Sequence, residues 1–198
     1  MKTPENITLL IKRIFDLSLA SFGMILFLPV WAFITLAIFF ETGRPIYYLQ
    51  DRVGLNKKVF MLFKFRSMKK DAEKDTGAVF AGRNDKRITR FGKLLRKTAM
   101  DELPQLINIV KGDMSFVGPR AERGIFVDEF IKNVPGYENR FLVKPGLTGL
   151  AQIKGRYDSS PDEKLSHDMY YIENMNFLFD IKLILLSIKN TFTLKWFL

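Results

Sequence analysis

The feature that most constrains this chain is an apolar run of 24 residues, Leu17 to Phe40, without a charged side chain. As one straight helix the run would be about 36 Å long, which exceeds the roughly 30 Å hydrocarbon core of a bilayer. It is too long, and begins too far along the chain, to be a cleaved secretory signal. The run therefore predicts a segment inserted in a membrane.

Two features argue against an ordinary crossing. Pro29 lies at the middle of the run, where its ring and missing N–H would kink a helix at a cost of about 3 kcal/mol. Each half would then be about 18 Å long, too short to cross alone. Positive charges flank both ends, which indicates that both stay on the cytoplasmic side; they are Lys12, Arg13, Arg44, Arg52, Lys57, Lys58, Lys64 and Arg66. Two interpretations stay open, a re-entrant helix–break–helix with its break at Pro29 and a proline-kinked span.

The basic residues are concentrated in the first half of the chain. Residues 1–100 carry 19 basic and 8 acidic side chains (+11), residues 101–198 carry 12 and 13 (−1), and the net charge is +10. This imbalance beside an apolar run favours contact with a membrane surface or a nucleic acid over an evenly charged soluble domain. A hydrophobic fraction of 47% argues against disorder.

The composition also restricts metal chemistry. The chain has no cysteine, which excludes disulfides, iron–sulfur clusters and thiolate zinc sites. Its one histidine, His167, cannot build a histidine-based metal site alone and is interpreted as a surface or packing residue. Any metal must therefore be held by oxygen, which points to Mg²⁺, Ca²⁺ or Mn²⁺.

Residues 177–198 form a second apolar stretch, interrupted by charges. Lys182 and Lys189 are one heptad apart and share a helical face, and Trp196 and Phe197 suit a membrane interface. The stretch predicts either an amphipathic helix on the membrane surface or a helix packed against the core.

The region between these segments indicates a compact domain of helices and short strands. Residues 45–51 and 58–66 favour strands, and the alternation in the second places Lys64 and Arg66 on one face, which suits an anion better than a core. Residues 67–87 predict a loop, either a linker or an active-site lid. Residues 86–97 predict a basic amphipathic helix that favours anionic lipid headgroups.

A pair of carboxylates follows this basic stretch. Asp101 and Glu102 precede Pro104, which is predicted in the first turn of an apolar helix. Acids at the start of a helix complement its dipole and can simply cap the helix. A functional interpretation gains support from cations that can hold a phosphate-bearing ligand beside the pair, namely Lys64, Arg66, Arg96 and Arg120. The turn-rich stretch 144–149 can bring backbone amides to such a ligand or serve the fold alone. The chain has no Walker loop, G-x-G-x-x-G or H-E-x-x-H motif.

In this order, these pieces resemble the monotopic phosphoglycosyl transferases, a family of bacterial sugar transferases. The resemblance runs from about Lys12 to Asp180, and the chain is similar in length to the minimal members that hold only the catalytic domain. Besides the apolar run with its proline, it rests on the segments KRIFD (12–16), QDRVG (50–54), KFRSM (64–68), DELPQL (101–106), GDMSFVGPR (112–120) and KPGLTGLAQ (144–152).

The resemblance implies an α+β fold, mostly helical with short strands, as a single membrane-embedded catalytic domain over residues 1–198. Its expected parts are a re-entrant membrane helix at 12–41, broken at Pro29, a cytoplasmic catalytic body at 42–176, and an interfacial amphipathic helix at 177–198. The expected location is the cytoplasmic face of the bacterial inner membrane, in monotopic form. Membrane lipid is an expected partner, nucleic acid is not, and a homo-oligomer is left open.

The resemblance also implies the activity, which is transfer of a phospho-sugar from a UDP-sugar to polyprenol phosphate with loss of UMP, the first membrane step of glycan assembly. The position of Asp101 is that of a nucleophile that forms a phospho-sugar adduct and lies beside Mg²⁺, and the position of Glu102 is that of a residue assisting it. The expected substrate-binding residues are Lys64, Arg66, Arg96, Arg120, Gln152 and Asp168. Gln152, Asp168 and Asp180 match positions usually retained, without an individual role.

Two departures and two alternatives accompany this prediction. Leu28 precedes Pro29 where the family often has serine, so no hydroxyl is available to the freed backbone. Ala121 stands where a second proline usually follows the Pro-Arg element, which leaves the stiffness of that loop open.

The mechanistic alternative is a direct single displacement. The functional alternative is a membrane-anchored, non-enzymatic binder of nucleic acid or acidic lipid, which leaves Asp101 and Glu102 without a role.

Overall fold

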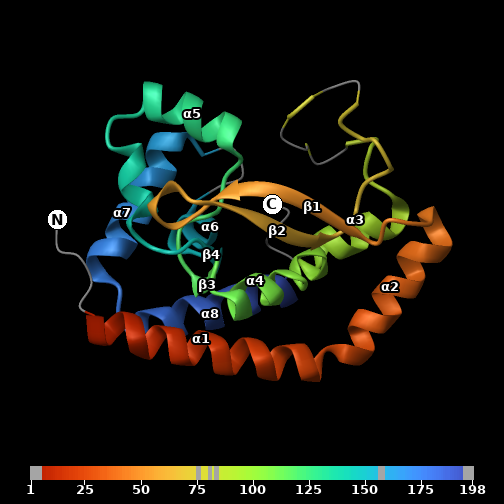
Figure 1. The fold of residues 1–198 in the computed structure, drawn as a ribbon, viewed down its shortest axis with the longest axis horizontal. Coiled ribbons are helices and arrows are strands. Elements are labelled where there is room, and N and C mark those ends of the chain that lie inside the picture. Colours follow the sequence, from red (N-terminus) through yellow and green to blue (C-terminus); the bar gives the residue numbers. More distant parts are fainter. Residues whose placement is uncertain (1–5, 75–76, 80–81, 83–84, 156–158, 194–198) are drawn as a thin grey trace.

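A computed structural model describes residues 6–74, 77–79, 82, 85–155 and 159–193 (Figure 1). The helices in this part of the chain are α1 (Asn6–Leu26), α2 (Leu28–Thr42), α3 (Arg90–Lys97), α4 (Gln105–Lys111), α5 (Gly124–Asn133), α6 (Leu150–Lys154), α7 (Pro161–Asn174) and α8 (Phe177–Phe192). The strands are β1 (Tyr47–Val53), β2 (Val59–Phe65), β3 (Ser115–Val117) and β4 (Gly146–Thr148). The 3₁₀ turns are η1 (Leu55–Lys57), η2 (Met100–Glu102) and η3 (Tyr137–Leu142). The predicted α+β class, helical with short strands, is confirmed.

The apolar run folds as a bent pair of helices, with the break at Phe27, two residues before Pro29. Phe27 separates α1 from α2, and Pro29 lies in the first turn of α2, where a missing N–H leaves no helical bond unmade. The two helices are bent by 61°; in Figure 1, α1 follows the lower edge of the molecule and α2 turns away from it. Among the described residues no single helix is long and apolar enough to cross a membrane, whereas this bent pair together meets those criteria.

The backbone at the break keeps its hydrogen bonds without a neighbouring hydroxyl. The N–H of Phe27 donates to the carbonyl of Gly23 at 2.9 Å, and the N–H of Trp31 donates to the carbonyl of Phe27 at 2.8 Å. The indole of Trp31 also donates to the hydroxyl of Tyr47 at 2.8 Å, which ties the start of α2 to β1. Leucine at position 28 is therefore compatible with a bonded break.

Two cations on α1 tie this helix to the rest of the fold. Arg13 donates to the carbonyls of Ile109 at 2.6 Å and Val110 at 2.8 Å, at the C-terminal end of α4, where a positive charge complements the helix dipole. The ammonium of Lys12 lies 2.5 Å from the carboxylate of Asp180 on α8. Both cations, which the sequence places at the flank of a membrane segment, are thus bound to protein groups.

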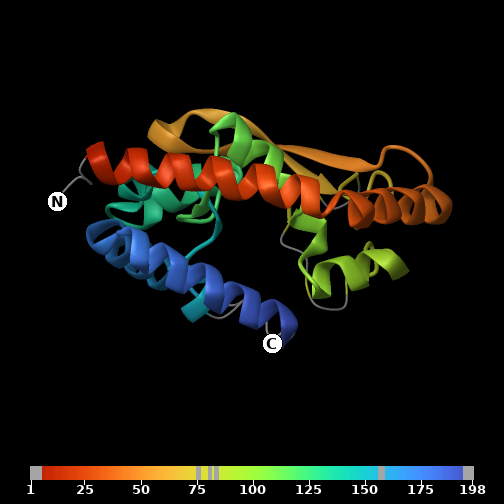
Figure 2. The ribbon, with the colours of Figure 1, turned by 90° about the horizontal axis from the view of Figure 1, so that it is seen from below.

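Helix α8 has a body-facing side and an apolar exposed side. Asp180 and Leu183 are buried, whereas Leu178, Leu185 and Phe192 are exposed. Figure 2 shows α8 beside α1 near the N-terminal ends of both helices. The buried side agrees with the predicted helix packed against the core, and the exposed apolar side agrees with the predicted helix at a membrane surface. Trp196 and Phe197, which are part of that prediction, lie outside the described residues.

The predicted strand pair is an antiparallel hairpin. β1 lies two residues later than the predicted range 45–51, and β2 is one residue shorter at each end than the predicted range 58–66. Its register places Tyr48 opposite Lys64. Leu62 is buried against α4 and points to the same face as Lys64. The hairpin therefore carries the Lys64 side chain toward the chain segment around α4.

A second, parallel sheet is formed by β3 and β4, with Ser115 opposite Gly146. The sequence predicts only turns at residues 144–149. The difference arises because β4 is three residues long and begins with a glycine, so it shows neither the length nor the alternation of a strand.

The basic amphipathic helix is present but begins later than predicted. Thr89 caps α3, because its hydroxyl accepts a bond from the N–H of Gly92 at 2.9 Å. Lys86 therefore lies outside the helix, while the helical cations Lys93 and Lys97 are exposed. Leu95 is buried against α2 and the end of β2.

Candidate active site

Asp101 and Glu102 lie in the turn η2, not in the first turn of an apolar helix. Ala99 adopts a left-handed conformation (φ 55°) that redirects the chain after α3. Helix α4 begins only at Gln105, and Pro104 precedes it with no side-chain capping bond. The interpretation of the two acids as caps of α4 is therefore wrong, and their placement needs another explanation.

Glu102 is held by two cations from distant parts of the chain. Its Oε1 lies 2.6 Å from Nζ of Lys64 on β2 and 3.8 Å from a guanidinium nitrogen of Arg120. Burial opposes ionisation of this carboxyl, but the charges of Lys64 and Arg120 outweigh it and lower the pKa of Glu102 to about 2. Glu102 is thus a carboxylate at neutral pH, and it orients both cations.

Asp101 is in the opposite electrostatic situation. Its side chain is buried, with only 7% of the residue exposed. Burial raises its pKa, and the neighbouring charge of Glu102 raises it further, while Lys64, Arg96 and Arg120 act in the other direction. Two adjacent carboxyls with pKa values shifted apart are typical of sites where the two groups have different chemical tasks.

A small hollow opens beside the dyad. Its lining includes Lys64 from β2, Glu102 from η2, Arg120 and Gly146 at the start of β4. Arg52 from β1 also lines it, and its position was not predicted as a site residue. The sequence pattern that could have identified Arg52 is the alternation along β1, which places Tyr48, Gln50 and Arg52 on one face of the strand. The hollow therefore presents mostly positive charge next to two carboxyls, an arrangement suited to a phosphate-bearing ligand.

The position of β2 relative to the dyad depends on Asn108, which sequence reasoning missed. Its side-chain oxygen accepts from the N–H of Phe63 at 3.1 Å, and its nitrogen donates to the carbonyl of Met61 at 2.7 Å. The fully buried amide thereby pairs with the free edge of β2 and holds it against α4. The sequence pattern that could have identified Asn108 is a polar residue between the apolar residues 106–107 and 109–110 of α4.

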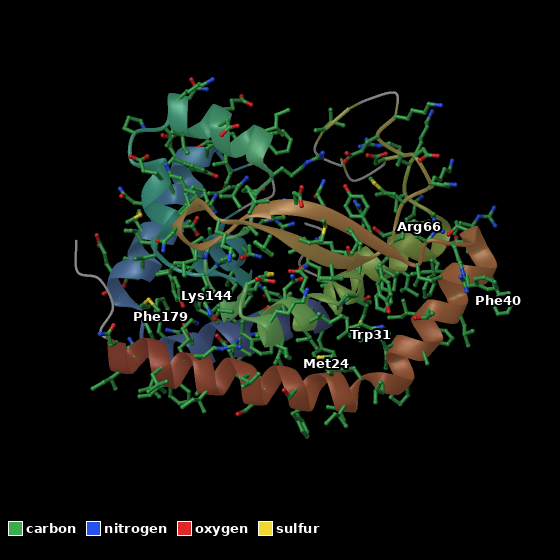
Figure 3. All side chains as sticks on the ribbon, in the orientation of Figure 1. Met24, Trp31, Phe40, Arg66, Lys144 and Phe179 are labelled. Carbon is green, nitrogen blue, oxygen red and sulfur yellow. The ribbon has the colours of Figure 1, made fainter. Side chains whose placement is uncertain are left out.

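Arg96 lies near the dyad and Arg66 does not contact it. The Nε of Arg96 donates to the hydroxyl of Ser67 at 2.8 Å, and its charge acts on Asp101. Arg66 follows β2 and is buried; its guanidinium donates to both the carbonyl (3.0 Å) and the hydroxyl (2.6 Å) of Thr42. Figure 3 shows Arg66 beside the end of α2. The predicted pairing of Lys64 and Arg66 at one anion site is therefore not what the structure shows.

Gln152 and Asp168 bind other parts of the protein. Gln152 donates to the carbonyl of Leu147 at 3.2 Å, and Asp168 is buried with its carboxylate 2.7 Å from Arg140. Neither residue is part of the hollow's lining. Both residues bind protein groups, and the substrate binding expected of them stays a prediction.

The loop that the sequence predicts at 67–87 is attached to the segment before α5. Glu73 accepts two hydrogen bonds from Arg123, at 2.8 and 3.0 Å, in a fork-like pair. Both residues act electrostatically on Tyr48, which faces the same side of β1 as Arg52. The described part of this loop is thus held by an ion pair, which a freely solvated linker would not require.

The acidic groups fit a metal ion only if a substrate supplies most of its ligands. Among the described residues no cluster of three or more acidic or histidine side chains is placed to hold a metal. Asp101 is next to Glu102, but Glu102 is engaged by Lys64. Because Mg²⁺ commonly binds through one or two carboxylates together with water and substrate phosphates, Asp101 fits an ion shared with a bound diphosphate.

Comparison with known proteins adds an independent finding. The family model described as bacterial sugar transferase matches residues 7–194. A UDP-N-acetylgalactosamine-undecaprenyl-phosphate N-acetylgalactosaminephosphotransferase of Aeromonas hydrophila is 40% identical over 193 residues, which are 96% of this chain and 45% of that protein. The UDP-glucose:undecaprenyl-phosphate glucose-1-phosphate transferase of Escherichia coli is 38% identical over 96% of this chain and 42% of its own length.

A third relative has a length closer to that of this chain. The exopolysaccharide production protein PSS of Rhizobium leguminosarum is 35% identical over 89% of this chain and 92% of its own length. The chain therefore spans less than half of the first two relatives and most of the third.

Proposed function

Because this chain belongs to the family of bacterial sugar transferases, we propose that it transfers a sugar 1-phosphate from a UDP-sugar to polyprenol phosphate. The products are UMP and a polyprenyl-diphosphate sugar, the first membrane intermediate of glycan assembly. The observation that carries this proposal is the buried Asp101 beside Glu102, with Lys64 and Arg120 on the same side. The names of two relatives contain both a UDP-sugar and undecaprenyl phosphate, which supports the same substrate classes.

The proposed reaction has two displacements at one phosphorus. The carboxylate of Asp101 attacks the phosphorus that carries the sugar, the bond to the bridging oxygen breaks, and UMP leaves with the electron pair. A phosphate oxygen of polyprenol phosphate then attacks the same phosphorus, and Asp101 is released as a carboxylate. Lys64, Arg96 and Arg120 support this route because cations that are already oriented stabilise the charge that develops on the phosphoryl oxygens.

Glu102 and the magnesium ion have supporting roles in this proposal. Glu102 holds Lys64 and Arg120 through its two ion pairs, so that the cations stay beside Asp101. Asp101 is the protein ligand proposed for Mg²⁺, together with the substrate diphosphate. When bound, the ion neutralises phosphate charge and polarises a phosphoryl oxygen.

The alternative function, a non-enzymatic binder of nucleic acid or acidic lipid, is less well supported. It accounts for the net charge and for the exposed basic residues of α3. It gives no reason to bury Asp101 beside Glu102 and its two cations, and the family match favours transfer.

We place the chain on the cytoplasmic face of the bacterial inner membrane, with α1 and α2 as a re-entrant pair and α8 at the interface. The support is the 61° bend and the large apolar side chains that the three helices leave exposed. They are Ile14, Phe22, Ile25, Leu28, Phe33, Phe40, Leu185 and Phe192, among others. The body over residues 42–176 would then remain in the cytoplasm as a single catalytic unit.

The re-entrant arrangement predicts that Asn6 and Lys132 lie on the same side of the membrane. The chain has no cysteine, so single cysteines at these two exposed positions can be labelled without background. We expect an impermeant maleimide to leave both Asn6→Cys and Lys132→Cys unlabelled in intact cells and to label both after permeabilisation. Labelling of Asn6→Cys alone in intact cells would establish a kinked crossing instead.

The activity is tested by screening UDP-sugars for UMP release with the purified chain, polyprenol phosphate and Mg²⁺. UDP-N-acetylgalactosamine and UDP-glucose are the first choices, because these sugars appear in the names of relatives. We expect UMP release and a lipid-linked product from at least one donor, and loss of both with a chelator. No product from any donor, together with salt-sensitive binding of nucleic acid, would favour the alternative function.

A further inference from the structure

The loop that carries Arg120 is fixed through its backbone carbonyls. Each carbonyl from Pro119 to Glu122 accepts a hydrogen bond, and the donors lie on β1, on β4 and in the turn η3. The donors are Gly146 N to Pro119 (2.9 Å), Arg140 Nη2 to Arg120 (3.1 Å), Arg52 Nη1 to Ala121 (3.0 Å) and Val53 N to Glu122 (3.0 Å). This clamp provides rigidity at a loop where the family pattern has a proline and this chain has Ala121.

Arg140, one of the clamp's donors, is paired with a buried acid from another helix. Its guanidinium nitrogen Nη2 lies 2.7 Å from Oδ2 of Asp168 on α7, and the same nitrogen donates to the carbonyl of Arg120. The other nitrogen, Nη1, donates to the hydroxyl of Tyr137. The planar fork of a guanidinium reaches three partners in fixed directions, which a lysine ammonium on a flexible stem does not reproduce.

The Arg140–Asp168 pair lies in the protein interior. Arg140 is 4% exposed and Asp168 is 1% exposed. A charge at this depth is costly unless it is paired, so removal of either partner leaves the other uncompensated and free to shift. A shift of Arg140 would release the carbonyl of Arg120, and the Arg120 guanidinium lies only 3.8 Å from Glu102.

We propose that Asp168 and Arg140 are positioning residues, which fix the backbone of Arg120 and so set its guanidinium beside the Asp101–Glu102 dyad. This inference rests on the proposed function for its kinetic readout. In this proposal Asp168 does not contact the substrate, because its carboxylate is paired with Arg140. Arg52 acts on the next carbonyl in the same way, while its side chain also lines the hollow.

A double-mutant cycle tests the proposal. Asp168→Asn, Arg120→Ala and the double variant are compared in the full-length chain for kcat and KM of the UDP-sugar and for the affinity of UDP by calorimetry. We expect Asp168→Asn alone to lower kcat/KM about 10-fold, and to have an effect of less than about 2-fold when Arg120 is already alanine, because residues in one network are non-additive. Equal effects of Asp168→Asn in both backgrounds would overturn the positioning role.

Asp180→Asn is the matched control. Asp180 is also a buried acid, 4% exposed and paired with a cation, but its partner Lys12 lies on α1. Its effect should be the same with and without Arg120. If Asp168→Asn does not fold, Arg140→Lys replaces it in the cycle, since it keeps the positive charge beside Asp168 and loses the fork.

The two proposals fail in distinguishable ways. An active wild-type chain with an additive cycle would overturn the positioning role and leave the proposed transfer intact. A wild-type chain that turns over no UDP-sugar would overturn the transfer. The UDP-affinity cycle would then still decide the positioning role, with coupling between Asp168 and Arg120 supporting it and additivity overturning it.

Discussion

Replacing Asp101 by asparagine is expected to abolish sugar-phosphate transfer, with kcat lowered about 10³-fold or more, as for loss of a covalent nucleophile. Asparagine has nearly the same size, so the buried site next to Glu102 can keep its packing. An amide does not attack phosphorus at a useful rate, and it removes the negative charge that Lys64 and Arg96 face. The measurement is UMP release under saturating UDP-sugar and polyprenol phosphate, together with the mass of the protein after exposure to UDP-sugar alone.

The wild-type chain should release one UMP per site without acceptor and gain the mass of a sugar phosphate on Asp101. Asp101→Asn should do neither and should remain in the membrane fraction. Asp128→Asn is the matched control, since Asp128 is exposed on α5, and it should retain wild-type activity. UMP release that requires polyprenol phosphate would establish a direct single displacement, and retained activity of Asp101→Asn would exclude Asp101 as the nucleophile.

Replacing Gly146 by alanine is expected to destabilise the fold by about 3 kcal/mol or more, which corresponds to a Tm lowered by about 10 °C for a chain of this size. A Cβ atom at this position would lie 2.1 Å from the backbone nitrogen of Gly118 and 2.3 Å from the carbonyl oxygen of Thr148. Both neighbours are backbone atoms, so no flexible side chain can move aside. The N–H of Gly146 also bonds to Pro119, so the change should disturb the Arg120 loop.

Gly124→Ala is the control for this substitution. Gly124 begins α5, and a Cβ there meets no heavy atom within 4 Å. Its Tm, measured by circular dichroism in detergent, should stay within about 2 °C of wild type, because the change adds no clash. Equal Tm values for the two variants would show that β3 and β4 can separate at little cost.

Local patterns were sufficient for several elements of this fold. Pro29 within an uncharged run predicts the break between α1 and α2. Proline lacks an N–H and its ring clashes with the preceding turn of a helix, so its effect does not depend on the tertiary structure. The alternation around Lys64 predicts β2, and the structure shows that strand. The sequence also predicts that Asp101 and Glu102 lie between a basic helix and an apolar helix, as the structure shows. The explanation by helix capping was wrong, because α4 has no side-chain cap.

Roles that depend on side-chain partners were not predictable in this way. Lys64 and Arg66 share a strand face by alternation, yet Lys64 binds Glu102 on η2 and Arg66 binds Thr42 at the end of α2. Which partner each cation meets depends on the helix or turn that packs beside it. Asp168 is predicted as a site residue from its position in the sequence, and the structure adds that it is the counter-ion of Arg140.

The sequence by itself determined the broken apolar segment, the hairpin, the excess of positive charge and the pair of acids that follows the basic helix. These are properties of neighbouring residues, and backbone geometry and charge spacing act on them directly. The tertiary structure alone decided which cation meets which acid, because Lys64 and Glu102 are separated by 38 positions and meet only when β2 is held against α4 by Asn108. Which residues meet across a long sequence separation depends on how whole helices and strands pack together. Packing depends on the shapes of many buried side chains, which a local sequence pattern does not specify.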